Sequence, residues 1–362
     1  MAISVNPSKV PLSDTAREAI LAEPGFGKYF TDNMVTANWS STSGWSELSL
    51  TAYGPLSLDP ATMVLHYGQE VFEGLKAYRQ PDGGVAIFRA EQNARRFARS
   101  ANRLALPELP EELFLESVRA LVSEDQKWVP VQADESLYLR PMMIATEVGL
   151  GVRPSSKAEY ILIASPAGAY FKGGVRPVTV WISTEYVRAA PGGTGEAKCG
   201  GNYAASLIAQ QAAAAQGCDQ VVWLDAVHRE YVEEMGGMNL YFVMGSGANA
   251  RVMTPKLTGT LLAGITRDSI LTLAADLGYV VDEISITVDQ WRKGVADGEI
   301  TEVFACGTAA VITPVGTVKG ATGEWTHGNG ECGPIALQLR ETLLGIQGGL
   351  IPDVHGWMER VI

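Results

Sequence analysis

The chain has 362 residues, of which 46% are hydrophobic and 19% are charged, and its formal net charge is -12. This length is more than one hydrophobic core usually serves, so we expect two domains. An acidic chain without a block of Lys and Arg argues against nucleic acid and anionic membranes as partners, and any anionic substrate then requires a local positive pocket.

Cysteine and histidine are sparse in this sequence. The cysteines are Cys199, Cys218, Cys306 and Cys332, without a C-x-x-C pair, and the four histidines have no metal-ligand spacing. The first residues, MAISVNPSKVPLSD, contain no apolar signal core, and no apolar run reaches the roughly 18 residues of a membrane helix. We therefore expect a reduced, cytoplasmic protein without a metal site.

The N-terminal half alternates strand and helix patterns. Residues 53–79 indicate a strand, a turn and a buried segment. Residues 91–104 place apolar side chains on one face and arginines opposite, which predicts an amphipathic helix. A second helix is predicted at 111–128, followed by strands at 136–146 and 159–165.

The C-terminal half begins after FKGGVRP at 171–177, a glycine- and proline-containing stretch. Its most glycine-dense segment is PGGTGEAKCGG at 191–201, and residues 202–216, NYAASLIAQQAAAAQ, predict one helix by propensity. The other predicted elements are strands at 177–184, 219–225, 229–234, 238–244 and 301–315, and helices at 265–278 and 333–346. We expect two mixed α/β domains, 1–171 and 186–362, joined by a linker at 172–185.

Lys198 lies in the glycine-dense segment, and taken alone it is expected to be an ordinary solvated lysine. A phosphate-binding P-loop is excluded, because Ala197 and Cys199 stand where that motif needs Gly and then Ser or Thr. The dinucleotide-binding fingerprint lacks its third glycine. Small neighbours leave room for a flat cofactor, and a partly desolvated lysine near positive charge is a nucleophile toward aldehydes.

Seven segments of the chain share a family pattern. They are HYGQEVFEGLKAY, LYLRPMMIATEVGLGV, SPAGAYFKGG, AKCGGNYAASL, EEMGGMNLYFV, LLAGITRDSIL and TEVFACGTAAVITPV. In this order they resemble branched-chain amino acid aminotransferases, in the class IV family that depends on pyridoxal 5'-phosphate (PLP). The resemblance covers nearly the whole chain and implies a two-domain fold-type IV enzyme. A small N-terminal α/β domain, a larger C-terminal domain, PLP at their interface and a homodimer are implied.

The resemblance also implies how PLP is held. Lys198 is implied to form the Schiff base and to move the α-proton, and Tyr203 to hydrogen-bond the phenolic oxygen. Glu234 is implied to keep the ring nitrogen protonated, which suits the chemistry because a protonated ring withdraws electrons from the α-carbon. Packing at a helix start is the alternative for Tyr203. Glu233 points to the other face of the strand and is expected to be solvated.

For the phosphate, Ile265 and Thr266 open a helix whose N–H groups suit a dianion, and Thr266 could also cap that helix. The resemblance adds Thr308 and Arg96. Arg95 is adjacent, one of the two arginines must face solvent on a helix, and the choice between them stays open.

The implied substrate pocket is apolar with one arginine. Arg140, beside Tyr138 on a strand, is implied to receive the distal carboxylate of glutamate and 2-oxoglutarate, because a buried arginine is costly without an anionic partner. The other implied residues are Phe26, Phe72, Tyr170, Ala309 and Ala310, with Tyr67, Leu150 and Val152 reaching across from a second subunit. Core packing is the ordinary alternative for each aromatic residue.

The implied activity is ping-pong transamination from L-leucine, L-isoleucine or L-valine to 2-oxoglutarate, in the setting of branched-chain amino acid biosynthesis. The nearest alternative is another fold-type IV enzyme, a D-amino acid aminotransferase or an aminodeoxychorismate lyase. A non-catalytic binding protein is disfavoured because every expected cofactor residue is present. A thiol enzyme at Cys199 lacks a paired histidine.

The sequence departs from the family in two places. The C-x-x-C pair that mammalian members carry after the Gly-Thr-Ala turn is absent. Gly237 stands where some members have Thr, which could widen the pocket and leaves the preference among substrates open.

Overall fold

The computed structural model describes residues 3–169 and 174–362, so the predicted pocket residue Tyr170 lies outside the described residues. The chain divides into two compact units. Unit 1 comprises Met1–Tyr170, Ala197–Gly200 and Gly345–Ile362, and unit 2 comprises Phe171–Glu196 and Gly201–Leu344. The predicted domains 1–171 and 186–362, with a linker at 172–185, remain a prediction. In the structure, two segments that come later in the chain, Ala197–Gly200 and Gly345–Ile362, also group with unit 1.

Unit 1 contains a ten-stranded sheet in the order β1-β4-β2-β9-β8-β6-β7-β19, with β3 paired to β2 and β5 paired to β8. Its strands are β1 (Ser4–Asn6), β2 (Asn33–Ser40), β3 (Gly44–Trp45), β4 (Ser49–Ala52), β5 (Glu70–Phe72), β6 (Leu75–Arg79), β7 (Val85–Phe88), β8 (Ser136–Ala145), β9 (Lys157–Ala167) and β19 (Met358–Arg360). Its helices are α1 (Asp14–Leu21), α2 (Met63–Tyr67), α3 (Ala90–Arg103), α4 (Glu111–Glu124) and the short 3-10 helix η1 (Gln126–Trp128).

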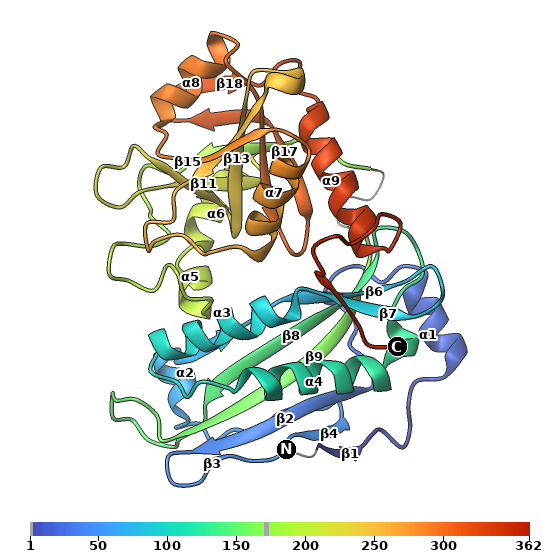
Figure 1. The fold of residues 1–362 in the computed structure, drawn as a ribbon. Coiled ribbons are helices and arrows are strands. Elements are labelled where there is room, and N and C mark those ends of the chain that lie inside the picture. The colour runs from blue at the N-terminus through green and yellow to red at the C-terminus, as the bar shows by residue number, and fades with distance from the viewer. Residues whose placement is uncertain (1–2, 170–173) are drawn as a thin grey trace. The chain divides into compact units, whose positions relative to one another are not determined.

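The core of unit 1 lies between the sheet and the helices α3 and α4, which run along one face of it (Figure 1). Phe97 of α3 and Phe114 of α4 pack on Tyr160 of β9, with ring centroids 5.8 and 6.4 Å away. All three rings are buried, and the Tyr160 hydroxyl is hydrogen-bonded to Ser117 at 2.8 Å. This packing fixes α3, which carries Arg95 and Arg96.

Unit 2 contains a nine-stranded sheet in the order β12-β11-β10-β17-β16-β13-β14-β15, and an additional β12–β13 pairing closes six of these strands into a ring. Its strands are β10 (Val178–Ile182), β11 (Gln220–Leu224), β12 (Val232–Met235), β13 (Met238–Met244), β14 (Arg251–Pro255), β15 (Val280–Ile284), β16 (Ile300–Gly307), β17 (Val311–Gly320) and β18 (Gly323–Thr326). The helices are α5 (Gly200–Ala204), α6 (Leu207–Ala215), η2 (Gly247–Asn249), α7 (Ile265–Asp276), α8 (Val288–Ala296) and α9 (Pro334–Gln347).

The mixed α/β class and most predicted elements are confirmed, but two predictions are wrong. The helix predicted at 202–216 is two helices, α5 and α6, because Ser206 donates both its backbone N–H and its hydroxyl to the Tyr203 carbonyl. The strand predicted at 229–234 begins only at Val232. The preceding loop folds around Asp225, whose carboxylate accepts the backbone N–H groups of Glu230 and Tyr231.

Within residues 3–169 and 174–362, no helix is both long enough and apolar enough to cross a membrane.

Candidate functional site

The backbone around Lys198 is held by three groups of unit 1. The Lys198 N–H donates to the Ser100 hydroxyl oxygen at 3.0 Å, and its carbonyl accepts the Phe72 N–H at 3.0 Å. Two residues on, the Gly200 N–H donates to the carboxylate of Glu70. A Cβ at position 200 would collide with that carboxylate, so glycine is required for this close approach.

The side chain of Lys198 shares an aromatic ring with Arg140. The Lys198 Nζ and the Arg140 Cζ each lie 4.8 Å from the centroid of the Phe72 ring, which is cation–π distance. Arg140 also donates from Nε to the Glu73 carbonyl and from Nη2 to the Tyr138 hydroxyl, both at 2.9 Å. Both of these acceptors are neutral oxygens, so neither supplies the anionic partner that we predicted for Arg140.

Phe26 and Tyr138 extend this arrangement. Their rings meet edge to face at a centroid distance of 5.0 Å, and Phe26 is 47% exposed. The Tyr138 hydroxyl lies where a Cβ on Gly74 would stand, so only glycine at 74 permits its position. Unit 1 therefore brings together Phe26, Phe72, Tyr138, Arg140 and Lys198, five of the predicted site residues.

Arg95 and Arg96 separate as the helix geometry predicts. Arg95 has a half-exposed side chain that bonds to Glu111 at 3.1 and 3.2 Å. Arg96 is buried, and its Nε and Nη2 donate to the two carboxylate oxygens of Glu73 at 2.7 and 2.8 Å. Burial raises the pKa of Glu73, but Arg96 and Lys198 outweigh it and the net pKa is lowered. The buried arginine is thus Arg96, and it is already held by a carboxylate.

In unit 2, the side chain of Glu234 is surrounded by donors. Its Oε1 accepts the Leu262 N–H at 2.8 Å and the Asn239 amide at 3.2 Å, and its Oε2 lies 2.7 Å from the Arg188 Nε. Glu234 is buried on β12. An arginine and two N–H donors stabilise the ionised form of a buried carboxylate, which is the form that an acid facing a pyridine nitrogen needs.

Arg188 was missed by the sequence reasoning. It is buried, and besides Glu234 its guanidinium contacts the carbonyls of Gly195 and Thr260. The segment around it, YVRAAP, contains no pattern that distinguishes this arginine. The available signal was indirect, because a predicted buried glutamate needs a cation and Arg188 lies three residues before the glycine-dense segment.

The prediction that Glu233 is a solvated strand residue is wrong. Its side chain is only 5% exposed, because the segment that carries Thr260 lies against it. The Thr260 hydroxyl donates to its Oε1.

Tyr203 lies within α5, four residues into the helix, and is 37% exposed. It faces Gly237, where an added Cβ would come within 3.4 Å of the Tyr203 ring. That is ordinary van der Waals distance, so a side chain at 237 would rest on Tyr203 rather than be excluded.

The predicted phosphate residues of unit 2 occupy two turns. Helix α7 begins at Ile265, with Gly264 as its N-cap and no side-chain cap, so Thr266 is not the capping residue. A Cβ on Gly264 would lie too close to the amide oxygen of Asn239, a residue of β13. Glycine at 264 therefore allows the start of α7 to pack against β13. Thr308, Ala309 and Ala310 form the turn between β16 and β17. These backbone N–H groups and hydroxyls are of the kind that hold a phosphate.

Tyr67, Leu150 and Val152 lie on the surface of unit 1. They are 38%, 66% and 82% exposed, and the Tyr67 hydroxyl donates to the Leu150 carbonyl.

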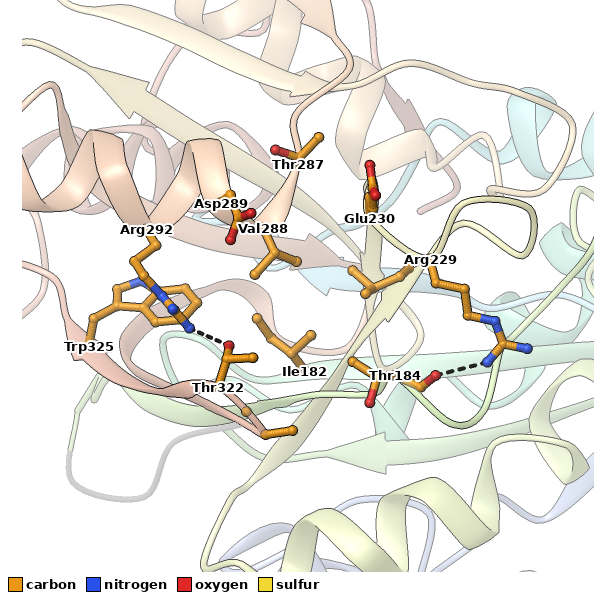
Figure 2. A pocket seen from close by; sticks show the side chains of 13 residues that line it. Ile182, Thr184, Arg229, Glu230, Thr287, Val288, Asp289, Arg292, Thr322 and Trp325 are labelled. Carbon is orange, nitrogen blue, oxygen red and sulfur yellow. Dashed lines mark hydrogen bonds between the residues drawn. The ribbon is translucent and has the colours of Figure 1, made fainter.

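Two cavities of unit 2 contain none of the predicted site residues. One, of about 250 Å³, is lined by residues that include Ile182, Arg229, Asp289 and Trp325. Figure 2 shows that its arginines are already engaged, since Arg292 bonds to Thr322 and Arg229 to the Thr184 carbonyl. The other, of about 300 Å³, is lined by Glu233 and Thr260 among others.

The chain is similar to known proteins over nearly its full length. The family described as Amino-transferase class IV matches residues 70–318. A branched-chain-amino-acid aminotransferase of Mycolicibacterium smegmatis is 62% identical over 99% of this chain and 98% of that protein. One of Mycobacterium tuberculosis strain H37Rv is 60% identical over 97% and 96%.

Solved structures agree with the sequence relatives. The Escherichia coli branched-chain amino acid aminotransferase has a TM-score of 0.74 and 30% identity, over 90% of this chain and 99% of that one. The T.th. branched-chain amino acid aminotransferase with pyridoxamine 5'-phosphate has a TM-score of 0.73 and 33% identity, over 90% and 98%.

Proposed function

Because the chain belongs to the class IV amino-transferase family, we propose that it moves the amino group of L-leucine, L-isoleucine or L-valine to 2-oxoglutarate. The products are the branched 2-oxo acids and L-glutamate. The relatives named as branched-chain-amino-acid aminotransferases span nearly the whole chain, which favours this function over a D-amino acid aminotransferase or an aminodeoxychorismate lyase.

The observation that carries the proposal is the ring of Phe72 with two cations against it. Lys198 brings an amine and Arg140 a guanidinium to the same aromatic ring. An amine can react with an aldehyde, and a guanidinium can receive a carboxylate bidentately. An apolar ring beside both groups suits a substrate with either an aliphatic or a carboxylate side chain.

We propose PLP as the cofactor, since its chemical demands match the residues present. Lys198 would bind its aldehyde carbon and Glu234 its ring nitrogen, and Tyr203 would donate to its phenolic oxygen. The start of α7 at Ile265 and Thr266, with Thr308 and Arg96, would hold its phosphate. When bound, the cofactor supplies an electron sink for the α-carbon of the amino acid.

Each residue of the site would have a separate role in the reaction. Lys198 Nζ would take the proton from the α-carbon of the amino acid and deliver it to the aldehyde carbon of the cofactor, as general base and then acid. Glu234 remains ionised through the reaction because Arg188 and two N–H donors hold it. Arg140 orients 2-oxoglutarate by its distal carboxylate. The apolar groups that would hold a branched side chain and exclude water are those of Phe26, Phe72, Tyr138, Tyr170, Ala309 and Ala310.

We also propose a homodimer in which Tyr67, Leu150 and Val152 complete the substrate pocket of a second copy. The support is their exposure, because large apolar side chains gathered on a surface mark a contact region. Sedimentation equilibrium would give twice the chain mass, and Leu150→Asp would shift the mass toward the monomer. A monomeric wild-type protein at full activity would refute this part.

The location that fits the four free cysteines is the cytoplasm, as predicted from the sequence.

The decisive experiment is a visible spectrum with a product assay. The purified protein should carry an absorption band of lysine-bound PLP that borohydride bleaches and that Lys198→Ala abolishes. Lys157→Ala, at an exposed lysine of β9, is the matched control and should keep the band. Leucine with 2-oxoglutarate should yield L-glutamate. A colourless protein that does not take up PLP, or formation of D-glutamate, would overturn the proposal.

A further inference from the structure

Glu233 is a second buried carboxyl group beside the acid that faces the ring nitrogen. It is 5% exposed and adjacent to Glu234 on β12. Its Oε1 accepts the Thr260 hydroxyl, whereas its buried Oε2 has no hydrogen-bond partner among the residues that the structure describes. Glu234 has an arginine and two N–H donors, so the two neighbouring carboxyl groups are supported very unequally.

Thr260 connects Glu233 to Arg188. Its hydroxyl donates to Glu233, and its carbonyl accepts from the Arg188 Nη2. The same Nη2 donates to the Gly195 carbonyl at 3.0 Å, while the Nε lies against Glu234. A displacement of Thr260 would therefore also displace the guanidinium of Arg188, which lies against Glu234.

Arg188 supports the two carboxyl groups unequally, because it lies against Glu234 and is linked to Glu233 through Thr260. Burial raises the pKa of Glu233, and the Thr260 hydroxyl and the charge of Arg188 offset only part of that rise. An ionised buried carboxylate with a single hydrogen bond is costly, whereas a protonated one is a neutral polar group. Two acids that share a site take up protons unequally, and the less supported one stays protonated.

On the far side of Glu233, Asp225 acts in the same direction as burial. Glu233 lines the cavity of about 300 Å³, whose other titratable residues are Asp225, His228, Tyr231 and Lys256. Burial raises the pKa of Asp225, but backbone N–H groups of its loop outweigh this and the net pKa is lowered. A negative charge on Asp225 disfavours a second one on Glu233.

We propose that Glu233 is a protonated carboxylic acid and acts as a positioning residue for Arg188. It fixes Thr260 by a hydrogen bond, and because it is neutral it leaves the charge of Arg188 to Glu234. An ionised Glu233 would divide that charge and loosen Glu234 from its place. The functional part of this inference rests on the proposed role of Glu234 at the ring nitrogen of PLP; the protonation state does not.

The first test is infrared difference spectroscopy of the holoenzyme at neutral pH, wild type against Glu233→Gln. The wild type should show the C=O stretching band of a protonated carboxylic acid that the variant lacks. Both spectra are recorded without leucine, so the measurement requires no turnover. Failure of the proposed transamination would therefore not affect the result. A difference spectrum without this band would overturn the inference.

The second test is the pH dependence of unfolding. Because folding raises the pKa of Glu233, its contribution to stability is present below the ordinary value of 4.5 and is lost as pH rises above it. Glu233→Gln has no such loss, so the variant should gain stability relative to wild type as pH increases from about 4.5 toward neutrality. If the stability of the variant relative to wild type stays constant or falls over this range, Glu233 is not protonated at neutral pH.

The third test separates positioning from simple packing. Glu233→Gln should keep the affinity for PLP and the kcat within about twofold, because the amide still accepts from Thr260. Glu233→Ala should weaken PLP binding about tenfold and shift the pH profile of the visible band, as would Thr260→Val. If Glu233→Gln lost PLP as severely as Glu233→Ala, a neutral acid would not be what the site requires.

Discussion

The two units differ in the sign of the charged groups that they bring together. In unit 1, Lys198 and Arg140 lie against the ring of Phe72, and Arg96 bonds to the carboxylate of the next residue, Glu73; we call these three cations with Phe72 and Glu73 the cation cluster. In unit 2 two acids, Glu233 and Glu234, meet a single arginine, Arg188; we call this the carboxylate cluster.

The difference follows from what each kind of charge can use as a partner. Guanidinium and ammonium groups rest on aromatic faces and donate to carbonyls, so several cations can stay charged around one carboxylate. A carboxylate is not stabilised by an aromatic face and needs hydrogen-bond donors. Where too few donors are available, it takes up a proton. The cation cluster therefore suits binding of anions, and the carboxylate cluster suits a single well-defined negative charge.

The largest effect should come from removing the carboxylate of Glu73 from the cation cluster. Glu73→Ala leaves the buried Arg96 without its bidentate partner, which we expect to cost about 3–5 kcal/mol of unfolding free energy. Urea denaturation of the apoprotein measures it. The double variant Glu73→Leu with Arg96→Met should recover most of the loss, because no buried charge then remains. If Glu73→Ala unfolds like the wild type, Arg96 has another partner of equal strength and the comparison fails.

The carboxylate cluster can be disturbed without touching a charge. Gly195 packs so closely on Thr260 and Ala189 that an added Cβ would lie 2.6 Å from the Ala189 Cβ. Gly195→Ala should therefore cost about 1–3 kcal/mol and displace the Thr260 carbonyl from Arg188. Gly201→Ala is the matched control, since nothing lies within 4 Å of a Cβ there. Equal stability of the two variants would mean that the loop yields to a methyl group at no cost.

The sequence predicts the members of these clusters better than their pairings. Lys198, Arg140 and Glu234 stand in segments that resemble the family, so their types and order were visible. Arg188 and Thr260 carry no such pattern, and their roles come from a backbone path that brings 188, 195 and 260 together. Long-range hydrogen bonds of this kind leave no periodicity in a sequence.

Helices and strands show the same limit at their ends. The helix of residues 90–103 was predicted within one residue, because its apolar face and its arginines repeat with the helical period. The alanine-rich stretch gave no sign of its break, because propensity favours a helix at every position. A single serine hydroxyl at 206, bonded to the Tyr203 carbonyl, accompanies the turn there. The hydrogen bonds of Ser206 to the Tyr203 carbonyl break the helix there, although the average helix propensity of the segment favours its continuation.

A smaller effect should follow from a neutral change in the cation cluster. Tyr138→Phe removes the hydroxyl that accepts from the Arg140 Nη2 and leaves the ring in place. The KM for 2-oxoglutarate should rise about five- to tenfold, which corresponds to about 1 kcal/mol, because the guanidinium becomes less well oriented. The KM for leucine is the internal control and should change less than about twofold, since an aliphatic side chain does not use that guanidinium. Equal changes for both substrates would show that Tyr138 shapes the pocket rather than orients Arg140.

The smallest effect should come from the arginine that lies outside the cation cluster. Arg95 is half-exposed and bonds to Glu111 and, at 3.7 Å, to Glu91, so solvent and salt screen its ion pairs. Arg95→Ala should leave the urea midpoint within the scatter of replicate curves and leave the affinity for PLP unchanged. Arg96→Ala, one position along α3, should lower both, because burial and the contact with Glu73 tie that side chain to the core. If Arg95→Ala weakens PLP binding more than Arg96→Ala does, the phosphate is held from the exposed face of α3, and burial is the wrong guide to which arginine serves the cofactor.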